Sequence, residues 1–388
     1  MYVETPPRAS KRSLAGLRSR FLAVDWSFPS STPDPAHDLH PYPAKYIGAI
    51  PAAAITLAPD EGAILDPFCG VGTTRAGRRA IGVDLNPIAT LVTRTKLSGW
   101  FADDTALHAQ HRLAFVGAAR GGDTESLAAA RARIPRLDHW FDPLAQWALA
   151  GATSYINTLH PDDPWRDRLA TALSIIAVRA SRQESDTRYA AVDKELTAAA
   201  ICDGLGRAVD RVASACSALA ASVDNAPAPL VVTDDASNIH TTLGGEEVAA
   251  AIFSPPYPNA YEYWLYHKYR MYWLGFEPLA VRSREIGARP SYSGSGRLTE
   301  DNFADQMALV LGGIRRRLRS DGVVVIVVGD SIIRGRHIHN AAVLDAVADR
   351  SGLRLVARTT RTIRRTRRSF NLAVARAQAE HVLLLGPQ

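Results

Sequence analysis

Ile64-Leu65-Asp66-Pro67-Phe68-Cys69-Gly70-Val71-Gly72-Thr73-Thr74 predicts a buried strand that opens into a glycine-rich turn. Gly70 and Gly72 permit positive φ and a close approach of a ligand to the backbone. A second strand is predicted at residues 80–83, and Asp84 follows it directly. An acidic side chain at this point can accept hydrogen bonds from two ribose hydroxyls. The stretch therefore predicts a Rossmann-like sheet with a nucleoside site at its edge.

The turn differs from that of nicotinamide-dinucleotide enzymes. Their G-x-G-x-x-G pattern has a third glycine where this chain has Arg75, so an NAD-binding fold is the weaker interpretation. Only residues 73–79 are available for a helix before the second strand. Such a helix has about two turns at most, which is short for a connection between parallel strands.

Ser254-Pro255-Pro256-Tyr257 directly follows the apolar run 248–253, which is predicted to be a buried strand. Two successive prolines remove two backbone donors, and the residue before each is pushed into extended geometry. The result is a stiff segment with free carbonyl oxygens at a strand end. The alternative explanation is that the two prolines only mark an ordinary loop after the strand.

In this order, the glycine-rich turn, Asp84 and Ser-Pro-Pro-Tyr resemble the motifs of S-adenosylmethionine-dependent DNA amino-methyltransferases of the cytosine-N4-specific type. The resemblance covers residues 40–89 and 230–328, and more faintly the end of the chain. It implies that the catalytic residues are Ser254, Pro255, Pro256 and Tyr257. The Ser254 hydroxyl and the Pro255 carbonyl would accept hydrogen bonds from the exocyclic amine of a flipped cytosine, and Tyr257 would stack on the base.

The resemblance also implies a cofactor site. His40-Pro41-Tyr42-Pro43-Ala44-Lys45-Tyr46 is similar to a segment that borders the methionine end of the cofactor in this family, where Tyr42 and Lys45 would meet its carboxylate. Asp235, in an acidic turn after the predicted strand 230–232, is the candidate partner of the adenine amino group. The full candidate set is Tyr42, Pro43, Lys45, Asp66, Pro67, Phe68, Cys69, Gly70, Gly72, Thr73, Thr74, Asp84, Leu85, Asn86 and Asp235.

Three segments are candidates for contacting nucleic acid. Asn259 and Tyr261 lie beside the prolines, and residues 181–189 resemble a Ser-Asp-Thr-Arg segment that lies near the substrate in related enzymes. A cap between two helices is the competing interpretation of residues 181–189. An arginine-rich stretch lies between the last two predicted strands, where phosphate contacts are expected. The candidates are Arg182, Asp186, Arg188, Asn259, Tyr261, Arg364, Arg365, Arg367 and Arg368.

Bulk composition agrees with a polyanionic partner. The chain has 388 residues, a net charge of +6 and an isoelectric point near 9.3. Cys69, Cys202 and Cys216 have no disulfide or metal-ligand spacing, which fits a reducing cytoplasm, and none follows a proline as carbon-5 methylation would require. No long apolar stretch predicts a signal peptide or a membrane span. His337 and His339 lack further ligands at metal spacing, so no metal is expected.

The predicted fold class is α/β: a Rossmann-like class I methyltransferase fold with a seven-stranded, mostly parallel sheet, a reversed hairpin at one edge and a helical insertion. Residues 1–36 form an N-terminal arm. Residues 37–102 form the cofactor half of the methyltransferase domain and residues 223–388 its catalytic half. Residues 103–222, rich in apolar residues at helical spacing, form the insertion and are the candidate target-recognition region. A polar loop over residues 282–297 is expected to assist it.

The function predicted is site-specific methylation of cytosine N4 in double-stranded DNA, either as a solitary enzyme or beside a cognate restriction endonuclease. Ser rather than Asp or Asn before the prolines favours cytosine over adenine N6 as a habit of the family. An RNA amino-methyltransferase is the first rival. A non-catalytic DNA-binding relative, whose short helix after Gly72 no longer supports cofactor binding, is the second.

Overall fold

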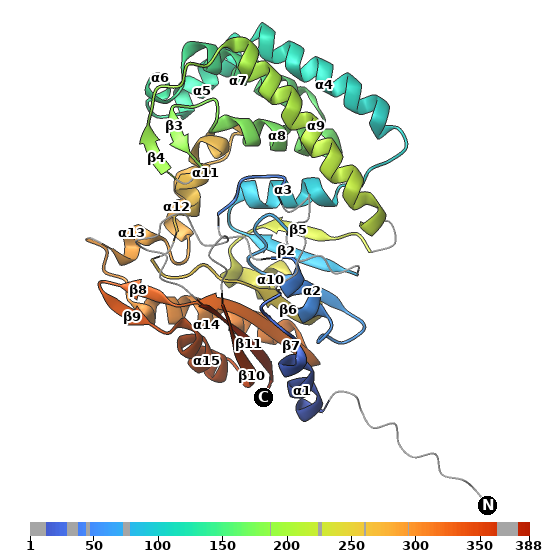
Figure 1. Ribbon diagram of the computed structural model, residues 1–388, viewed down its shortest axis with the longest axis vertical. Coiled ribbons are helices and arrows are strands. Elements are labelled where there is room, and N and C mark those ends of the chain that lie inside the picture. The colour runs from blue at the N-terminus through green and yellow to red at the C-terminus, as the bar shows by residue number, and fades with distance from the viewer. Residues whose placement is uncertain are drawn as a thin grey trace, which may run out of the picture.

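The computed structural model describes residues 13–28, 38–43, 47–72, 78–186, 188–223, 227–259, 261–293, 295–362 and 379–388. Its central feature is a seven-stranded sheet in the order β10-β11-β7-β6-β1-β2-β5 (Figure 1). The strands are β1 Ala63–Asp66, β2 Ala80–Asp84, β5 Leu230–Thr233, β6 Val248–Phe253, β7 Leu318–Gly329, β10 Leu353–Thr362 and β11 Ala379–Pro387.

The pairing confirms the predicted Rossmann-like fold class. β5, β2, β1, β6 and β7 pair in parallel, whereas β11 runs antiparallel to both β7 and β10. Every residue of β6 is buried, as are residues 323–328 of β7. Such continuous apolar runs are what a parallel sheet covered on both faces requires.

Helices cover both faces of the sheet. Phe303, Met307 and Leu344, from α14 and α15, pack on one face, while Phe21 and Ile50, from α1 and α2, pack on the other. The bounds are α1 Leu14–Ala23, α2 Ala49–Ile55, η1 Ala236–Asn238, α10 Ile239–Thr242, α14 Glu300–Arg317 and α15 Asn340–Arg350. α3, Pro87–Leu97, contacts β2 and β5 and carries the insertion on its outer side.

The insertion between α3 and β5 is helical, as predicted from its spacing of apolar residues, and it lies beside the sheet rather than within it (Figure 1). A buried ion pair joins Arg168 to Asp104, with Nη1 of the arginine 2.6 Å from the carboxylate. The elements are α4 Asp104–Gly121, α5 Thr124–Arg133, α6 Leu137–Trp140, α7 Pro143–Thr158, α8 Pro164–Ala177, β3 Gln183–Ser185, β4 Arg188–Ala191 and α9 Ala198–Val223. The domain boundaries themselves stay a prediction.

The segment after β6 bridges the insertion and the sheet. It contains α11, Tyr263–Trp273, which is rich in aromatic residues and contacts α3 and α8. The expectation of a polar loop over residues 282–297 is wrong, because α12, Pro278–Arg284, and α13, Arg289–Tyr292, occupy part of it. A small hairpin follows β7, formed by β8, Ser331–Ile333, and β9, Arg336–Ile338. None of the helices in the described ranges combines the length and apolar character that crossing a bilayer requires.

Candidate functional site

A cavity of about 840 Å³, part of it open to solvent, lies at the carboxyl ends of β1, β2 and β6. Ligands bind at this edge of open α/β sheets because the strand order reverses there and leaves a crevice. The residues that line it are Tyr42, Pro43, Pro67, Phe68, Cys69, Gly70, Val71, Asp84, Leu85, Asn86, Asp235, Ala236, Ser254, Pro256, Tyr263, Val281, Arg284, Glu285 and Ile286. Twelve of the candidate cofactor and catalytic residues are among them.

The glycine-rich turn has the backbone geometry that its sequence predicts. Gly70 has φ +50° and Gly72 has φ +71°, both in the region that side chains disfavour. A Cβ on Gly72 would lie 2.9 Å from Cγ2 of Thr93, which is too close for any larger residue. The Thr93 hydroxyl in turn donates to the Gly70 carbonyl at 2.9 Å. Helix α3 therefore holds the turn at the cavity wall.

Asp84 is fixed by the backbone on both sides of it. The amide of Gly70 donates to Oδ2 and the amide of Asn86 donates to Oδ1, each at 2.8 Å. Burial raises the pKa of the Asp84 carboxyl to about 6, and these two hydrogen bonds act in the opposite direction. Each oxygen accepts one bond and keeps further acceptor capacity, so the carboxylate can still receive hydroxyl donors from a ligand in the cavity.

Tyr42 is held by aromatic stacking. Its ring lies 4.7 Å from that of His267 and 5.7 Å from that of Tyr263, both on α11 and both nearly parallel to it. Burial raises the pKa of the Tyr42 phenol well above its ordinary value and lowers the pKa of His267 well below its own. The stack is therefore uncharged, and Tyr42 and Pro43 line the cavity. Their role toward the carboxylate of a cofactor stays a prediction.

The Ser-Pro-Pro-Tyr segment divides between the cavity and the sheet. Ser254 and Pro256 line the cavity, and Pro255 is buried. The Tyr257 ring packs on Gly329, where a Cβ would come within 2.9 Å of Cε2. Its hydroxyl lies 3.5 Å from Oγ of Ser254 and 3.3 Å from Oε1 of Glu380. Tyr257 is not one of the described residues that line the cavity. Base stacking by its ring therefore stays a prediction.

Two charged residues that line the cavity, Arg284 and Glu285, were not among the candidates from the sequence. Glu285 accepts hydrogen bonds from the backbone amides of Tyr263 at 2.7 Å and Trp264 at 2.9 Å, at the start of α11. Burial raises the pKa of Glu285 to about 7. Arg284 approaches Asp235, with Nε 3.3 Å from Oδ2. Only the aromatic run around Tyr263 gave a signal in the sequence, since Arg284 and Glu285 fell within the expected loop.

Asp235 is already engaged in local contacts. Its Oδ1 accepts from the backbone amide of Ser237 at 3.0 Å and from the Ser237 hydroxyl at 2.8 Å, which caps η1. Its Oδ2 faces Arg284. The carboxylate still lines the cavity, so a role toward an adenine amino group stays a prediction. Asp66 is buried and its Oδ1 accepts from the amide of Phe68 at 3.2 Å, which supports the turn rather than the cavity wall.

The candidate nucleic-acid residues are dispersed. In the described part of this segment, β3, Gln183–Ser185, pairs antiparallel with β4, Arg188–Ala191. Arg182 pairs with Asp142 and Asp193, Asp186 pairs with the buried Arg270, and Arg188 is exposed beside Glu184. Asn259 has φ +63°, and its Nδ2 donates to the carbonyl of Ile332 at 2.6 Å. The Tyr261 ring packs near Tyr263 and Tyr266.

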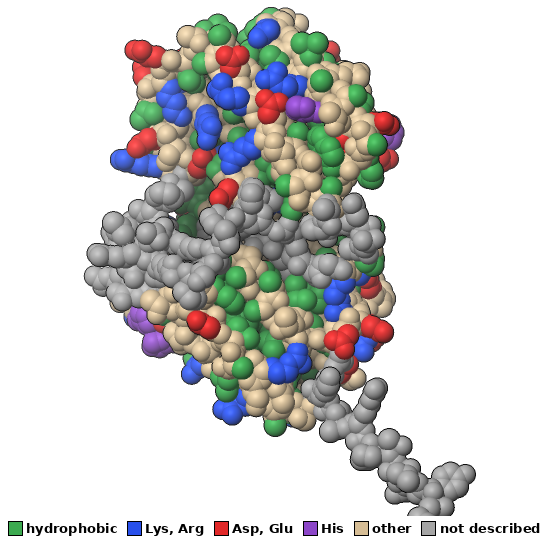
Figure 2. All heavy atoms as spheres, turned by 45° about the vertical axis from the view of Figure 1, so that its right-hand side comes forward, with side chains coloured by type: hydrophobic (Ala, Val, Ile, Leu, Met, Phe, Trp, Pro, Cys, Tyr) green, Lys and Arg blue, Asp and Glu red, His purple; other side chains and the backbone are tan. Residues whose placement is uncertain are grey.

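Several candidates lie outside the described residues. They are Lys45, Thr73, Thr74, Arg364, Arg365, Arg367 and Arg368. Basic and acidic side chains are interspersed over the insertion on the face shown in Figure 2. Mixed charge of this kind does not by itself identify a phosphate-binding stripe.

No protein-family model and no curated protein matches the chain. Among solved structures, a candidate DNA modification methylase from Thermus thermophilus is 19% identical with a TM-score of 0.24, over 39% of this chain and 50% of that chain. The chain thus spans about half the length of that protein. A TehB-like S-adenosylmethionine-dependent methyltransferase from Corynebacterium glutamicum is 12% identical with a TM-score of 0.31, over 89% of each chain. An rRNA methyltransferase from Streptomyces viridochromogenes is 12% identical with a TM-score of 0.31, over 91% of this chain and 90% of that chain. TM-scores this low leave the function to be argued from the site.

Proposed function

We propose that this chain is an S-adenosylmethionine-dependent methyltransferase that acts on the exocyclic N4 amine of cytosine in double-stranded DNA. One observation carries the proposal: Asp84, at the end of β2, and Ser254, at the end of β6, line the same cavity. The first residue type suits the ribose of a nucleoside cofactor, and the second begins a rigid segment with acceptors for an amine. The two halves of the predicted chemistry therefore share one site.

The cavity suits a cofactor that carries positive charge. Asp84, Asp235 and Glu285 bring three carboxyl groups to its wall, and Arg284 brings one guanidinium that already faces Asp235. S-adenosylmethionine, when bound, supplies a methyl group on a cationic sulfur. Asp84 would hold the ribose hydroxyls, the backbone of Gly70 would face the cofactor closely, and the remaining acidic groups would favour its cationic end by simple attraction.

Ser254 would act by positioning. An exocyclic amine shares its lone pair with the ring and is a poor nucleophile until its nitrogen becomes pyramidal. Oγ of Ser254 and the carbonyl oxygen of Pro255 would accept hydrogen bonds from its two N–H groups and favour that form. Because Pro255 and Pro256 fix the backbone here, both acceptors stay in place, and catalysis would rest on orientation.

The choice of DNA and cytosine rests on charge and on the identity of residue 254. The net charge of +6 suits a nucleic-acid partner, and Ser254 in place of Asp or Asn favours cytosine by resemblance. The helical insertion would contribute target recognition. If the enzyme protects host DNA, a cognate restriction endonuclease would act beside it. Adenine N6, an RNA amine and a non-catalytic relative are the competing outcomes.

Product analysis tests the proposal. The full chain would be incubated with radiolabelled S-adenosylmethionine and either duplex DNA or tRNA, followed by nuclease digestion and mass spectrometry of the nucleosides. N4-methylcytosine from duplex DNA supports the proposal, whereas N6-methyladenine or a labelled tRNA selects a rival. Calorimetry with the cofactor completes the test, because a folded chain that does not bind S-adenosylmethionine contradicts every enzymatic version.

A further inference from the structure

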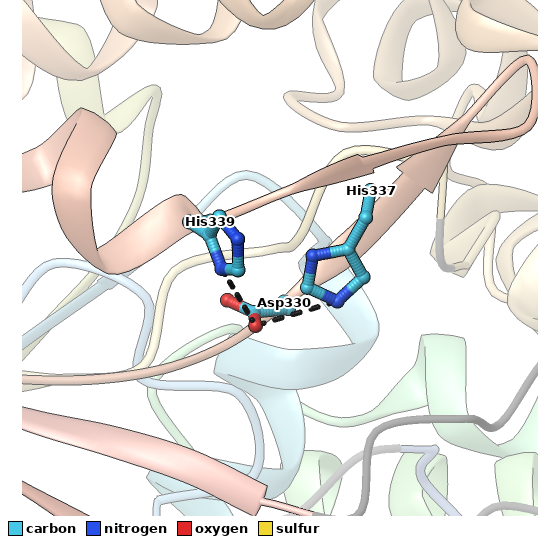
Figure 3. A group of neighbouring side chains, drawn as sticks. All are labelled: Asp330, His337 and His339. Carbon is cyan, nitrogen blue, oxygen red and sulfur yellow. Dashed lines mark hydrogen bonds and ion pairs between the residues drawn. The ribbon is translucent and has the colours of Figure 1, made fainter.

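We infer that Asp330, His337 and His339 form a binding site for one divalent transition-metal ion of the Zn²⁺ class. Asp330 directly follows β7, His337 lies in β9, and His339 precedes α15. Figure 3 shows both imidazole rings directed at the same carboxylate oxygen. The three ligand atoms all lie within 4.8 Å of one another. The inference concerns a site separate from the cavity and does not depend on the proposed activity.

The distances between the three side chains also fit ligands of one metal ion. Oδ2 of Asp330 lies 3.5 Å from Nε2 of His337 and 3.3 Å from Nδ1 of His339. The contact from His339 is a long hydrogen bond, and the contact from His337 is longer still. Around a tetrahedral Zn²⁺ with bonds of about 2.0–2.2 Å, neighbouring ligand atoms are separated by about 3.3–3.5 Å. The two measured separations are therefore those of two edges of such a tetrahedron.

A third histidine lies beside the other oxygen of the Asp330 carboxylate. Nε2 of His381 lies 3.5 Å from Oδ1 of Asp330, and its Nδ1 lies 3.0 Å from the hydroxyl of Thr360. Oδ1 of Asp330 is buried and accepts no hydrogen bond from the described residues. A ligating carboxylate commonly has such a neighbour that fixes its orientation. His381 would serve in this way, leaving Oδ2 for the metal.

The donor set selects the kind of metal. Two imidazole nitrogens and one carboxylate oxygen suit Zn²⁺ and its neighbours, whereas Mg²⁺ and Ca²⁺ prefer oxygen ligands alone. The side chains of His337 and His339 are 55% and 71% exposed. The face toward solvent is thus free for a water molecule as the fourth ligand.

The ion would fasten the β8–β9 hairpin to the end of β7. Asn259, in the loop after Ser-Pro-Pro-Tyr, donates to Ile332 in the same hairpin, and Gly329, one residue before Asp330, packs against Tyr257. In the sequence, His337 and His339 lack a further ligand at metal spacing, whereas the fold brings the ligand atoms of Asp330, His337 and His339 within 4.8 Å of one another. Because Asp330 and His339 are nine residues apart, no ligand spacing in the sequence pointed to Asp330.

Metal binding by the untagged full chain tests the inference. The protein would be treated with a chelator, dialysed and titrated with ZnCl₂ by calorimetry, with one ion expected per chain. His337→Ala and His339→Ala are expected to lower the affinity by about tenfold or more, as loss of a direct ligand should exceed loss of its supporting neighbours. His160→Ala is the matched control, since His160 lies 3.7 Å from Asp162 without a third ligand near it among the described residues.

Two further readouts separate binding from misfolding. Zn²⁺ should raise the unfolding temperature of the wild type and of His160→Ala but not of His337→Ala, because only a ligand of the native state stabilises it. Bound Co²⁺ should give the intense visible absorption of a tetrahedral site, and this should be lost in Asp330→Asn. A wild-type chain that binds no Zn²⁺, or a His337→Ala chain that binds it as tightly as the control, overturns the inference.

Discussion

The hydroxyl of Tyr257 lies 3.3 Å from Oε1 of Glu380, across the boundary between the parallel strands and the reversed strand of the sheet. The other oxygen of Glu380 lies 2.9 Å from Nη1 of Arg361, whose side chain is 7% exposed. Because Glu380 pairs with Gly329 across β11 and β7, this contact joins the Ser-Pro-Pro-Tyr segment to the C-terminal edge of the sheet. The direction of the Tyr257 ring is therefore set by residues far away in sequence.

Removing Glu380 should cost more stability than removing the Tyr257 hydroxyl. Glu380→Ala leaves the guanidinium of Arg361 buried without its partner, and such a loss costs about 3–5 kcal/mol. Tyr257→Phe removes one long hydrogen bond and should cost about 1 kcal/mol. Urea denaturation measures both free energies of unfolding, and equal costs for the two variants would contradict the arrangement.

Ser254→Ala should reduce catalysis without affecting cofactor binding. It removes one of the two acceptors proposed for the exocyclic amine, and a hydrogen bond of about 1.5 kcal/mol corresponds to about a tenfold fall in kcat. Single-turnover methylation measures this step, and calorimetry should give unchanged affinity for S-adenosylmethionine. Ser283→Ala is the matched control, because its exposed hydroxyl bonds only to the carbonyl of Ala280 among the described residues. Equal rates for both variants would remove Ser254 from the chemistry.

Cofactor affinity should fall as the solution becomes acidic. Burial raises the pKa of Asp84 to about 6, so the carboxylate proposed to accept ribose hydroxyls is present above that pH and lost below it. Between pH 7 and pH 5 the affinity for S-adenosylmethionine should drop by about tenfold, following the ionised fraction. Asp84→Asn should bind weakly at both values, while Asp203→Asn, on the exposed side of α9, should behave as the wild type. An unchanged affinity at pH 5 would argue against Asp84 as the ribose acceptor.

Much of the sheet and part of the cavity could be predicted from local patterns. The β-branched run 323–328 can only be a strand buried on both faces, and Gly70 and Gly72 take the positive φ values that only glycine adopts readily. The position of Asp84 at the end of β2 was enough to predict that it lies at the cavity. These signals work because each depends on neighbours within a few residues.

The remaining features depend on tertiary contacts. Helix α12 was hidden because Arg282, Ser283 and Arg284 give its exposed side a loop-like composition, although Glu277 caps its start through the amide of Leu279. Glu285 has no local motif, and only the packing of α12 against α11 brings it to the amide of Tyr263. The tie from Tyr257 to Glu380 joins residues separated by 123 positions. No periodicity in a sequence reports such a pair.

Glu285 should make the stability of the free chain depend on pH. Its folded pKa of about 7 lies above its ordinary value of 4.5, so the folded state binds this proton more tightly than the unfolded state. Its contribution to stability is therefore largest below pH 4.5 and is lost as the pH rises through 7. Between pH 5 and pH 8 this loss is on the order of 2 kcal/mol.

Urea denaturation of the wild type and of Glu285→Gln at both pH values measures this contribution, because glutamine does not titrate. The wild type should lose more stability than the variant between pH 5 and pH 8. At pH 8, a cationic ligand should stabilise the wild type more than it stabilises the variant. Glutamine lacks the negative charge that Glu285 would offer to the ligand in the cavity. Parallel pH dependences in the two proteins would show that Glu285 is not held in a buried environment.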